Sequence, residues 1–277
     1  MTANGQTAER HVSTNRPSPG EVALFATCLI DLFRPSAAFA AIDLLRAAGC
    51  DVAVPDGQSC CGQPAYNSGD RRDARALARQ TIDLLMPYRF VVVPSASCAG
   101  MLRNHYPKLL SEDPVYRDKA AALCDKTYEL SAFLAALPVQ QGDTPGDRRA
   151  RHITYHDSCS ALREVGVDAE PRTLIDQHAE LKLTESAEKE SCCGFGGTFC
   201  VKYDEISTHM ADRKLEAFVA SGAQTVTALD LGCLLHLAGR ARRRNLPLEF
   251  RHLAEVLAGC CDAPPIAASK DRDDGNG

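Results

Sequence analysis

The sequence predicts an α/β fold made of two duplicated Cys-Cys-Gly modules, each a small parallel sheet flanked by helices, related by pseudo-twofold symmetry. Two observations lead to this prediction. A Cys-Cys-Gly triplet occurs at residues 60–62 and again at 192–194, and each copy is framed by single cysteines at similar distances. Strand patterns also alternate with helical patterns in both halves, which favours parallel strands joined by helices.

The framing cysteines define the repeat. In the first half, 31 residues separate Cys28 from Cys60, and 36 separate Cys61 from Cys98. The corresponding intervals in the second half contain 32 and 39 residues. The second set consists of Cys159, Cys192, Cys193 and Cys233. A near-constant offset across four positions indicates an internal duplication.

In the first half, an apolar strand pattern at 21–27 ends at Cys28, and a helical pattern at 36–48 is stopped by Gly49. The elements expected next are a strand at 51–55, a loop at 57–69 that holds the cysteine pair, an amphipathic helix at 70–86, a strand at 90–93, and two or three helices up to residue 137.

The second half repeats this order. The expected elements are a strand at 152–156, a helical segment, a strand at 180–184, a loop with the second cysteine pair, a helix at 203–221 and a strand at 224–229. We expect a disordered tail at 1–20, a first module at 21–137, a linker at 138–150, a second module at 151–261 and a disordered tail at 262–277.

The composition limits the classes of function. The 277 residues are 45% hydrophobic, enough for sizeable cores in two domains. A net charge of −5 provides no electrostatic footprint for nucleic acid. Residues 1–20 lack the apolar segment of a secretory signal, and no apolar run approaches the roughly 18–20 residues of a membrane span. We therefore expect a cytoplasmic protein, where 13 cysteines indicate metal or redox chemistry.

Each half offers four thiols beyond the carboxyl ends of predicted strands, where ligand sites of open α/β sheets lie. Four is the ligand number of an iron–sulfur cluster or of a tetrahedral zinc ion. Adjacent cysteines on an extended chain point in opposite directions. The vicinal pairs therefore suit a multi-iron cluster better than a single zinc ion, for which Cys-x-x-Cys spacing is typical.

Residues beside the cysteines are candidates for contacts with such a centre. Gly194, Gly196 and Gly197 let backbone N–H groups approach cluster sulfurs, or form a plain flexible loop. Cys200 is either a ninth ligand or a bystander. The His156-Asp157 pair has two interpretations: the imidazole donates to a cluster sulfide or moves a proton with the electron, or Asp157 is a plain capping residue after the strand. Cys50 and Cys124 fit core positions, and the pair at 260–261 has no spaced partners.

The twice-repeated Cys … Cys-Cys-Gly … Cys pattern resembles the cysteine-rich CCG domain family. That family includes the B subunit of heterodisulfide reductase and iron–sulfur subunits of glycolate and glycerol-3-phosphate oxidoreductases. The resemblance covers about residues 21–260. Its most similar strings are those of members that serve lactate utilization: CLIDLFRP (28–35), SCCGQPAYNSG (59–69), PSASCAGML (94–102), YHDSCSALRE (155–164) and SCCGFGGTFCVKY (191–203).

The resemblance implies an electron-transfer subunit of an oxidoreductase, with no catalytic residue identified. It implies that one [4Fe–4S] cluster is held by each cysteine set. It also implies a second, ferredoxin-like iron–sulfur subunit and a third small subunit as partners, which together oxidise L-lactate to pyruvate.

The sequence departs from the heterodisulfide reductase subunit at one position of each module. That subunit ends each module with Cys-x-x-Cys, whereas here Ser95 and Asp230 stand at the earlier cysteine positions. Four thiols per half remain, which suits a conventional cluster rather than a noncubane one. Two alternatives stay open: a heterodisulfide reductase-like or glycolate oxidase-type subunit that acts on another substrate, and a zinc-binding scaffold.

Overall fold

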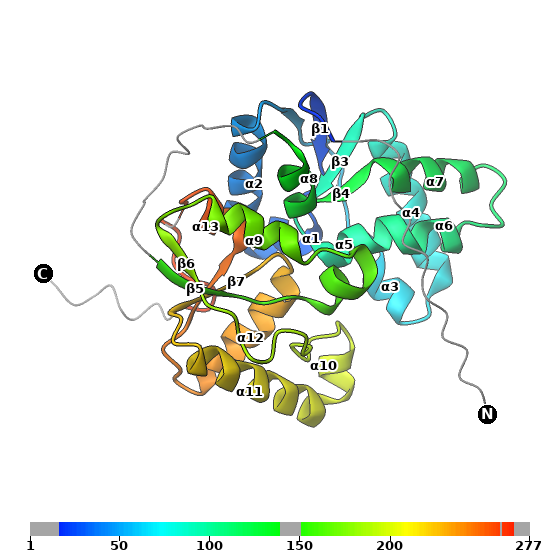
Figure 1. The fold of residues 1–277 in the computed structure, drawn as a ribbon. Helices are drawn as coiled ribbons and strands as arrows, with labels where there is room; N and C mark the ends of the chain where they lie inside the picture. The colour runs from blue at the N-terminus through cyan, green and yellow to red at the C-terminus, as the bar shows by residue number, and fades with distance from the viewer. Residues whose placement is uncertain (1–16, 139–150, 261, 269–277) are drawn as a thin grey trace, which may run out of the picture.

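The computed structural model of the chain describes residues 17–138, 151–260 and 262–268. Most of the predicted tails and linker lies outside the described residues. Within them, two α/β modules pack against each other, as Figure 1 shows, and the predicted fold class is confirmed.

The first module is built on one parallel sheet with the strand order β2-β1-β3-β4. Its elements are β1 (Glu21–Leu24), α1 (Cys28–Phe33), α2 (Pro35–Ala47), β2 (Asp51–Ala53), α3 (Gln63–Asn67), α4 (Arg71–Leu85), β3 (Phe90–Val93), α5 (Ala96–Gly100), the π-helical segment η1 (Met101–His105), α6 (Tyr106–Leu109), α7 (Arg117–Lys126), β4 (Thr127–Glu129) and α8 (Leu130–Ala136).

The second module repeats the topology with the strand order β6-β5-β7-β8, again all parallel. Its elements are β5 (Arg151–Tyr155), the π-helical segment η2 (Ala161–Val165), α9 (Ala169–Asp176), β6 (Leu181–Leu183), α10 (Phe199–Lys202), α11 (Asp204–Ala220), β7 (Thr225–Ala228), α12 (Leu231–Arg243), β8 (Glu249–His252) and α13 (Leu253–Leu257).

The central strands are buried because helices cover both faces of each sheet. All four residues of β3 are fully buried, the continuous apolar pattern of a parallel sheet. Helix α4 turns Ala74, Ala78 and Ile82 inward at helical spacing, and the Asp70 carboxylate caps it by accepting from the Asp73 N–H at 3.0 Å.

The two modules contact each other through two equivalent pairs of helices. α2 of the first module packs against α13 of the second, and α9 of the second packs against α8 of the first. Since α2 and α9 follow the first strands of their modules, and α8 and α13 follow the last, these reciprocal pairs are the pseudo-twofold relation that the duplication predicts. One hydrophobic core runs through both modules, and the Arg34 guanidinium donates to Glu255 across it at 2.8 Å.

Three local differences from the sequence prediction stand out. The fourth strands, β4 and β8, were not predicted, because they are short and carry polar residues such as Glu129 and His252. Those two side chains cap the helices that follow, α8 and α13. Residues 63–67, predicted as loop, form α3. Residues 262–268 of the predicted tail contact the second module, where Ile266 N–H donates to Phe250 O at 2.9 Å.

Candidate metal centres

The eight cysteines of the two sets lie just beyond strands at the same edge of each sheet. Cys28 opens α1 after β1, and Cys98 lies in α5 after β3. Cys159 follows β5, and Cys233 lies in the first turn of α12 after β7. The vicinal pairs occupy the loops after the edge strands β2 and β6. The topology therefore brings four thiols together in each module, as the spacing predicts.

In the first set, the thiols contact one another in sequence from Cys28 to Cys98. Cys28 contacts Cys60, Cys60 contacts Cys61, and the Sγ atoms of Cys61 and Cys98 are 3.3 Å apart. The Gly62 N–H lies 3.4 Å from Cys60 Sγ. A buried tyrosine holds the loop, since the Tyr106 hydroxyl donates to Cys61 O at 2.8 Å.

The second set has the same arrangement. Cys159 contacts Cys192, Cys192 contacts Cys193, and the Sγ atoms of Cys193 and Cys233 are 2.9 Å apart. Two backbone N–H groups point at the sulfurs: Gly194 N is 3.4 Å from Cys192 Sγ, and the next residue's N is 3.4 Å from Cys193 Sγ. These N–H groups are donors of the kind that cluster sulfurs accept.

Glycine is required where each cysteine pair turns. Gly62 has φ 83° and Gly194 has φ 87°, in the left-handed region that side chains disfavour. A Cβ at Gly194 would also lie 2.6 Å from the Ser207 carbonyl oxygen of α11. The close approach of α11 therefore excludes any side chain here, and the turn points both thiols of the pair inward.

The crowded thiols favour one thiolate in each set. Contacts with the Cys28 and Cys61 thiols lower the pKa of Cys60 to about 2. In the second set, contacts with Cys159 and Cys193 lower the pKa of Cys192 to about 2. The neighbours of these two residues have raised pKa values for the same reason. Thiolate is the form in which cysteine binds metals.

Both cysteine sets line a single cavity of about 320 Å³ between the modules. All eight cysteines of the two sets face it, together with several hydroxyl side chains and the Gly196–Gly197 backbone. Two centres held by these sets would therefore share one chamber.

Asp230, at the N-terminus of α12, ties the cysteine-bearing segments of both modules together. Its Oδ1 accepts from Ser95 Oγ at 2.8 Å and from Ser97 N and Oγ at 3.0 and 2.7 Å. Its Oδ2 accepts from the Ser158 hydroxyl, next to Cys159. Ser95 and Asp230 are the positions at which heterodisulfide reductase B carries further cysteines, and here they bond to each other across the pseudo-twofold axis.

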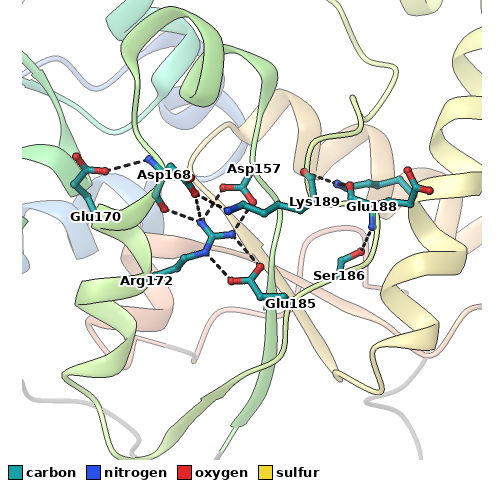
Figure 2. Close-up of polar contacts among 9 residues, drawn as sticks. Asp157, Asp168, Glu170, Arg172, Glu185, Ser186, Glu188 and Lys189 are labelled. Carbon is teal, nitrogen blue, oxygen red and sulfur yellow. Dashed lines mark hydrogen bonds and ion pairs between the residues drawn. The ribbon is translucent and has the colours of Figure 1, made fainter.

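Arg172 of α9 joins the segment before Cys159 to the segment before the second cysteine pair, and Figure 2 shows its guanidinium between Asp157 and Glu185. Its guanidinium donates to both Asp157 carboxylate oxygens at 2.9 and 2.8 Å and to Glu185 at 2.6 and 2.9 Å. It also meets Asp168, which pairs with Lys189 at 2.8 Å. Asp157 therefore pairs with an arginine, rather than capping a helix or contacting the thiols.

His156 lies against the second set. It is fully buried, and one of its ring nitrogens and the Sγ atoms of Cys193 and Cys233 all lie within 4.8 Å of one another. Burial, together with the cation of Lys214, lowers the pKa of His156 to about 3, so the ring is neutral.

Within the described residues, no cysteine other than the eight of the two sets lines the cavity. Cys200 donates to Gly197 O at 3.1 Å and is not among the cavity-lining residues. Cys50 and Cys124 are buried in the module cores, and Cys260 contacts the Ala258 carbonyl oxygen. Cys261 lies outside the described residues.

Sequence reasoning missed Arg172, Lys214 and the bonds of Asp230 to Ser95. Lys214 is fully buried and falls on the inward stripe of α11 between Ala211 and Phe218. A charged residue on an apolar stripe was the signal that could have identified it. The partners of Arg172 and Asp230 lie far away in the sequence, so no local pattern marks them.

The donor set fits a thiolate-bound metal centre in each module. Each set offers four sulfurs, backbone N–H groups aimed at sulfur, and a cavity beside them. Thiolate ligands suit iron–sulfur clusters and zinc.

Within the described part of the chain, every helix is too short or too polar to span a membrane.

A similar fold occurs in a hypothetical protein from Helicobacter pylori of known structure, with a TM-score of 0.59 and 11% sequence identity. The match covers 92% of this chain, and this chain spans about half (54%) of that protein. At this identity the likeness concerns the fold alone.

Curated relatives match at much higher identity. Lactate utilization protein A of Bacillus subtilis (strain 168) is 42% identical over 237 residues, covering 86% of this chain and 98% of the relative. The protein of the same name from Halalkalibacterium halodurans is 42% identical over 238 residues, covering 86% and 96%. Lactate utilization protein A 2 of Bacillus cereus (strain Q1) is 38% identical over 238 residues, covering 86% and 98%.

The family model of the cysteine-rich domain, CCG, matches twice, at residues 22–103 and 153–238. Each match contains one complete set of four cysteines and the turn that holds its vicinal pair. The chain therefore belongs to the cysteine-rich CCG domain family.

Proposed function

We propose that this protein is the iron–sulfur electron-transfer subunit of a cytoplasmic complex that oxidises L-lactate to pyruvate. The observation that carries the proposal is the pair of complete four-thiol sets that face one cavity. Curated relatives that match almost their whole length are named for lactate utilization, which supports lactate as the substrate.

In this proposal the eight cysteines of the two sets hold two [4Fe–4S] clusters, four thiolates to each. The N–H groups of Gly62, Gly194 and Phe195 hydrogen-bond to sulfur and keep the vicinal pairs turned inward. The clusters supply one-electron uptake and release. The eight cysteines would hold both centres against one chamber, where the clusters could exchange electrons.

Partner subunits complete the reaction. Oxidation of lactate to pyruvate releases two electrons and two protons. The sequence has no Gly-x-Gly-x-x-Gly turn after a strand to bind a dinucleotide that accepts hydride. We therefore assign the first electron acceptor to a partner, with a ferredoxin-like iron–sulfur subunit and a third small subunit in the complex.

The bond between Ser95 and Asp230 favours electron transfer over disulfide reduction. In the heterodisulfide reductase subunit, disulfide chemistry goes with a fifth thiol ligand at each cluster. The two positions that carry this thiol in the heterodisulfide reductase subunit hold a hydroxyl and a carboxylate that satisfy each other at 2.8 Å. Neither group is a nucleophile for sulfur exchange.

The first experiment is to measure iron, acid-labile sulfide and zinc per chain, with a visible spectrum, on protein purified without oxygen. Two four-iron clusters give about eight iron and eight sulfide per chain with a broad absorption band. A colourless protein with one or two zinc ions would contradict the proposal and support the scaffold alternative.

The substrate is tested on the complex isolated through a tag on this chain. L-lactate should bleach the visible band anaerobically, and D-lactate and glycolate serve as controls. Bleaching by glycolate but not by L-lactate would instead place the protein with the glycolate oxidase-type subunits.

A further inference from the structure

His156 is a buried polar side chain with no hydrogen-bond partner inside the described part of the protein. It lies directly after β5, and its side chain has no solvent exposure. Its backbone N–H donates to Thr227 O at 2.8 Å, whereas neither ring nitrogen has a partner. A buried imidazole normally satisfies its N–H group, so the missing partner belongs to a group that binds there.

The imidazole lies beside the second cysteine set. A ring nitrogen of His156 lies within 4.8 Å of the sulfurs of Cys193 and Cys233. The Phe218 ring and the imidazole pack in a T-shaped arrangement, with ring centroids 6.1 Å apart and an angle of 80° between the planes.

The first module has no such group. Three residues before Cys28 stands Phe25, as His156 stands three residues before Cys159, and Phe25 is also fully buried. The helices that cover the two cysteine pairs also carry different residues at equivalent positions. In α4, Thr81 lies seven residues after Ala74, which faces the Gly62 turn. In α11, Lys214 lies seven residues after Ser207, which faces the Gly194 turn. The second site therefore has a buried imidazole and a buried lysine where the first has Phe25 and Thr81, and the Lys214 ammonium donates to the carbonyl oxygens of Glu188 and Lys189.

We propose that His156 donates a hydrogen bond from its ring N–H to a sulfur of the centre in the second cysteine set, and thereby gives that centre the higher reduction potential of the two. The inference rests on the proposed function. Reduction adds negative charge that spreads onto the sulfurs, and a donor stabilises the reduced form more than the oxidised form. Phe25 provides no such donor, so an electron shared by the two centres resides mainly on the second.

The imidazole is a donor in this arrangement and not a ligand. Four thiolates already satisfy a four-iron cluster, and the second set has all four. Loss of the imidazole should therefore change the potential of the second centre and leave its iron in place.

The test is a redox titration followed by electron paramagnetic resonance, on anaerobically purified protein. It compares the wild type with H156F, which places the residue of the first module in the second, and with H156Q, which keeps an N–H donor. The Cys61→Ser background, with only the second set complete, assigns the signal. We expect H156F to lower the second midpoint by about 59 mV, a tenfold change in the ratio of reduced to oxidised centre. H156Q should lie closer to the wild type.

Three results overturn the inference while leaving the proposed function intact. The first is full iron content with an unchanged second midpoint potential in H156F. The second is an equal shift of that midpoint in H156F and H156Q. The third is loss of about half of the iron in both variants, which would make the imidazole a ligand. Wild-type protein without iron and sulfide would instead remove the proposed function itself.

Discussion

In the first module a neutral amide joins the strand end to the loop of the cysteine pair, whereas in the second a guanidinium does so. Gln58 accepts from Ala26 N at 2.8 Å and donates to Leu24 O at 3.0 Å. Arg172 instead holds Asp157 and Glu185 by charge-assisted bonds. The cysteine positions survived duplication almost unchanged, and their supports diverged. Ligand geometry and the electrostatic surroundings of a centre are thus separable properties of this fold.

The largest expected effect tests whether the two sets are independent. Cys61→Ser and Cys193→Ser should each remove about half of the bound iron, since each variant breaks one of two four-thiol sets. Cys50→Ser is the matched control, because Cys50 is buried in the core away from both sets. Complete iron loss from either single variant would mean that the two centres assemble only together.

The next largest effect tests the ionic clamp of the second module. Arg172→Met should lower the free energy of unfolding by about 3–5 kcal/mol, because it removes the cation that hydrogen-bonds to both oxygens of the buried Asp157 carboxylate. Gln58→Ala, its counterpart, should cost only about 1 kcal/mol. Urea unfolding measures both. Adding Asp157→Asn to Arg172→Met should recover much of the loss, and no recovery would refute the charge argument.

Asp230 and Ser95 occupy equivalent positions of the two modules and hydrogen-bond to each other. Asp230→Ala should destabilise the protein by about 2–3 kcal/mol, because it leaves buried donors of Ser95, Ser97 and Ser158 without an acceptor. Ser95→Ala removes a single donor and should cost about 1 kcal/mol. Equal losses in urea unfolding would show that the carboxylate does not tie the segments together.

A smaller, pH-dependent contrast involves the caps after the fourth strands. Burial raises the pKa of Glu129 to about 7, although hydrogen bonds from Ser131 and Ala132 oppose it. The folded state then binds the extra proton, so this contribution to stability is complete below pH 4.5 and is lost as the pH rises to about 7. Its full size is roughly 3 kcal/mol.

His252 behaves in the opposite way. Burial lowers the pKa of its imidazole, so its contribution is complete above pH 6.5 and is lost as the pH falls. Glu129→Gln should remove the loss of stability between pH 4.5 and 7 in urea unfolding, and His252→Gln should not. An unchanged pH profile in Glu129→Gln would show that this carboxyl does not titrate in that window.

Strand patterns predicted the central strands well because parallel strands covered on both faces are continuous apolar runs, as in β3. β4 and β8 were not predicted because they lack such an apolar run. They are three and four residues long and carry the buried polar residues Glu129, Arg251 and His252. Glu129 accepts from the nearby Ser131 and Ala132, whereas His252 also contacts the distant carbonyl oxygens of Pro94 and Leu229. A local pattern cannot distinguish a polar residue that caps a buried helix from one on a surface loop.

The candidate site divides in the same way. The eight cysteines and the glycine turns could be read from the sequence because a repeated spacing and a required backbone conformation are properties of the chain itself. The sequence left two interpretations of His156-Asp157 open, a contact with the centre and a capping Asp, and only the structure placed the two side chains. One lies against Cys193 and Cys233, and the other pairs with Arg172.

The sequence by itself determined the two-module α/β fold, the four thiols of each half and their place beyond the strand ends, because these follow from periodicity and duplication. The tertiary structure alone decided that both sets face one cavity, that Asp230 meets Ser95 across the modules, and that an unpartnered imidazole lies against only one set. Those features depend on which side chains meet after distant segments pack, and no local pattern encodes such contacts.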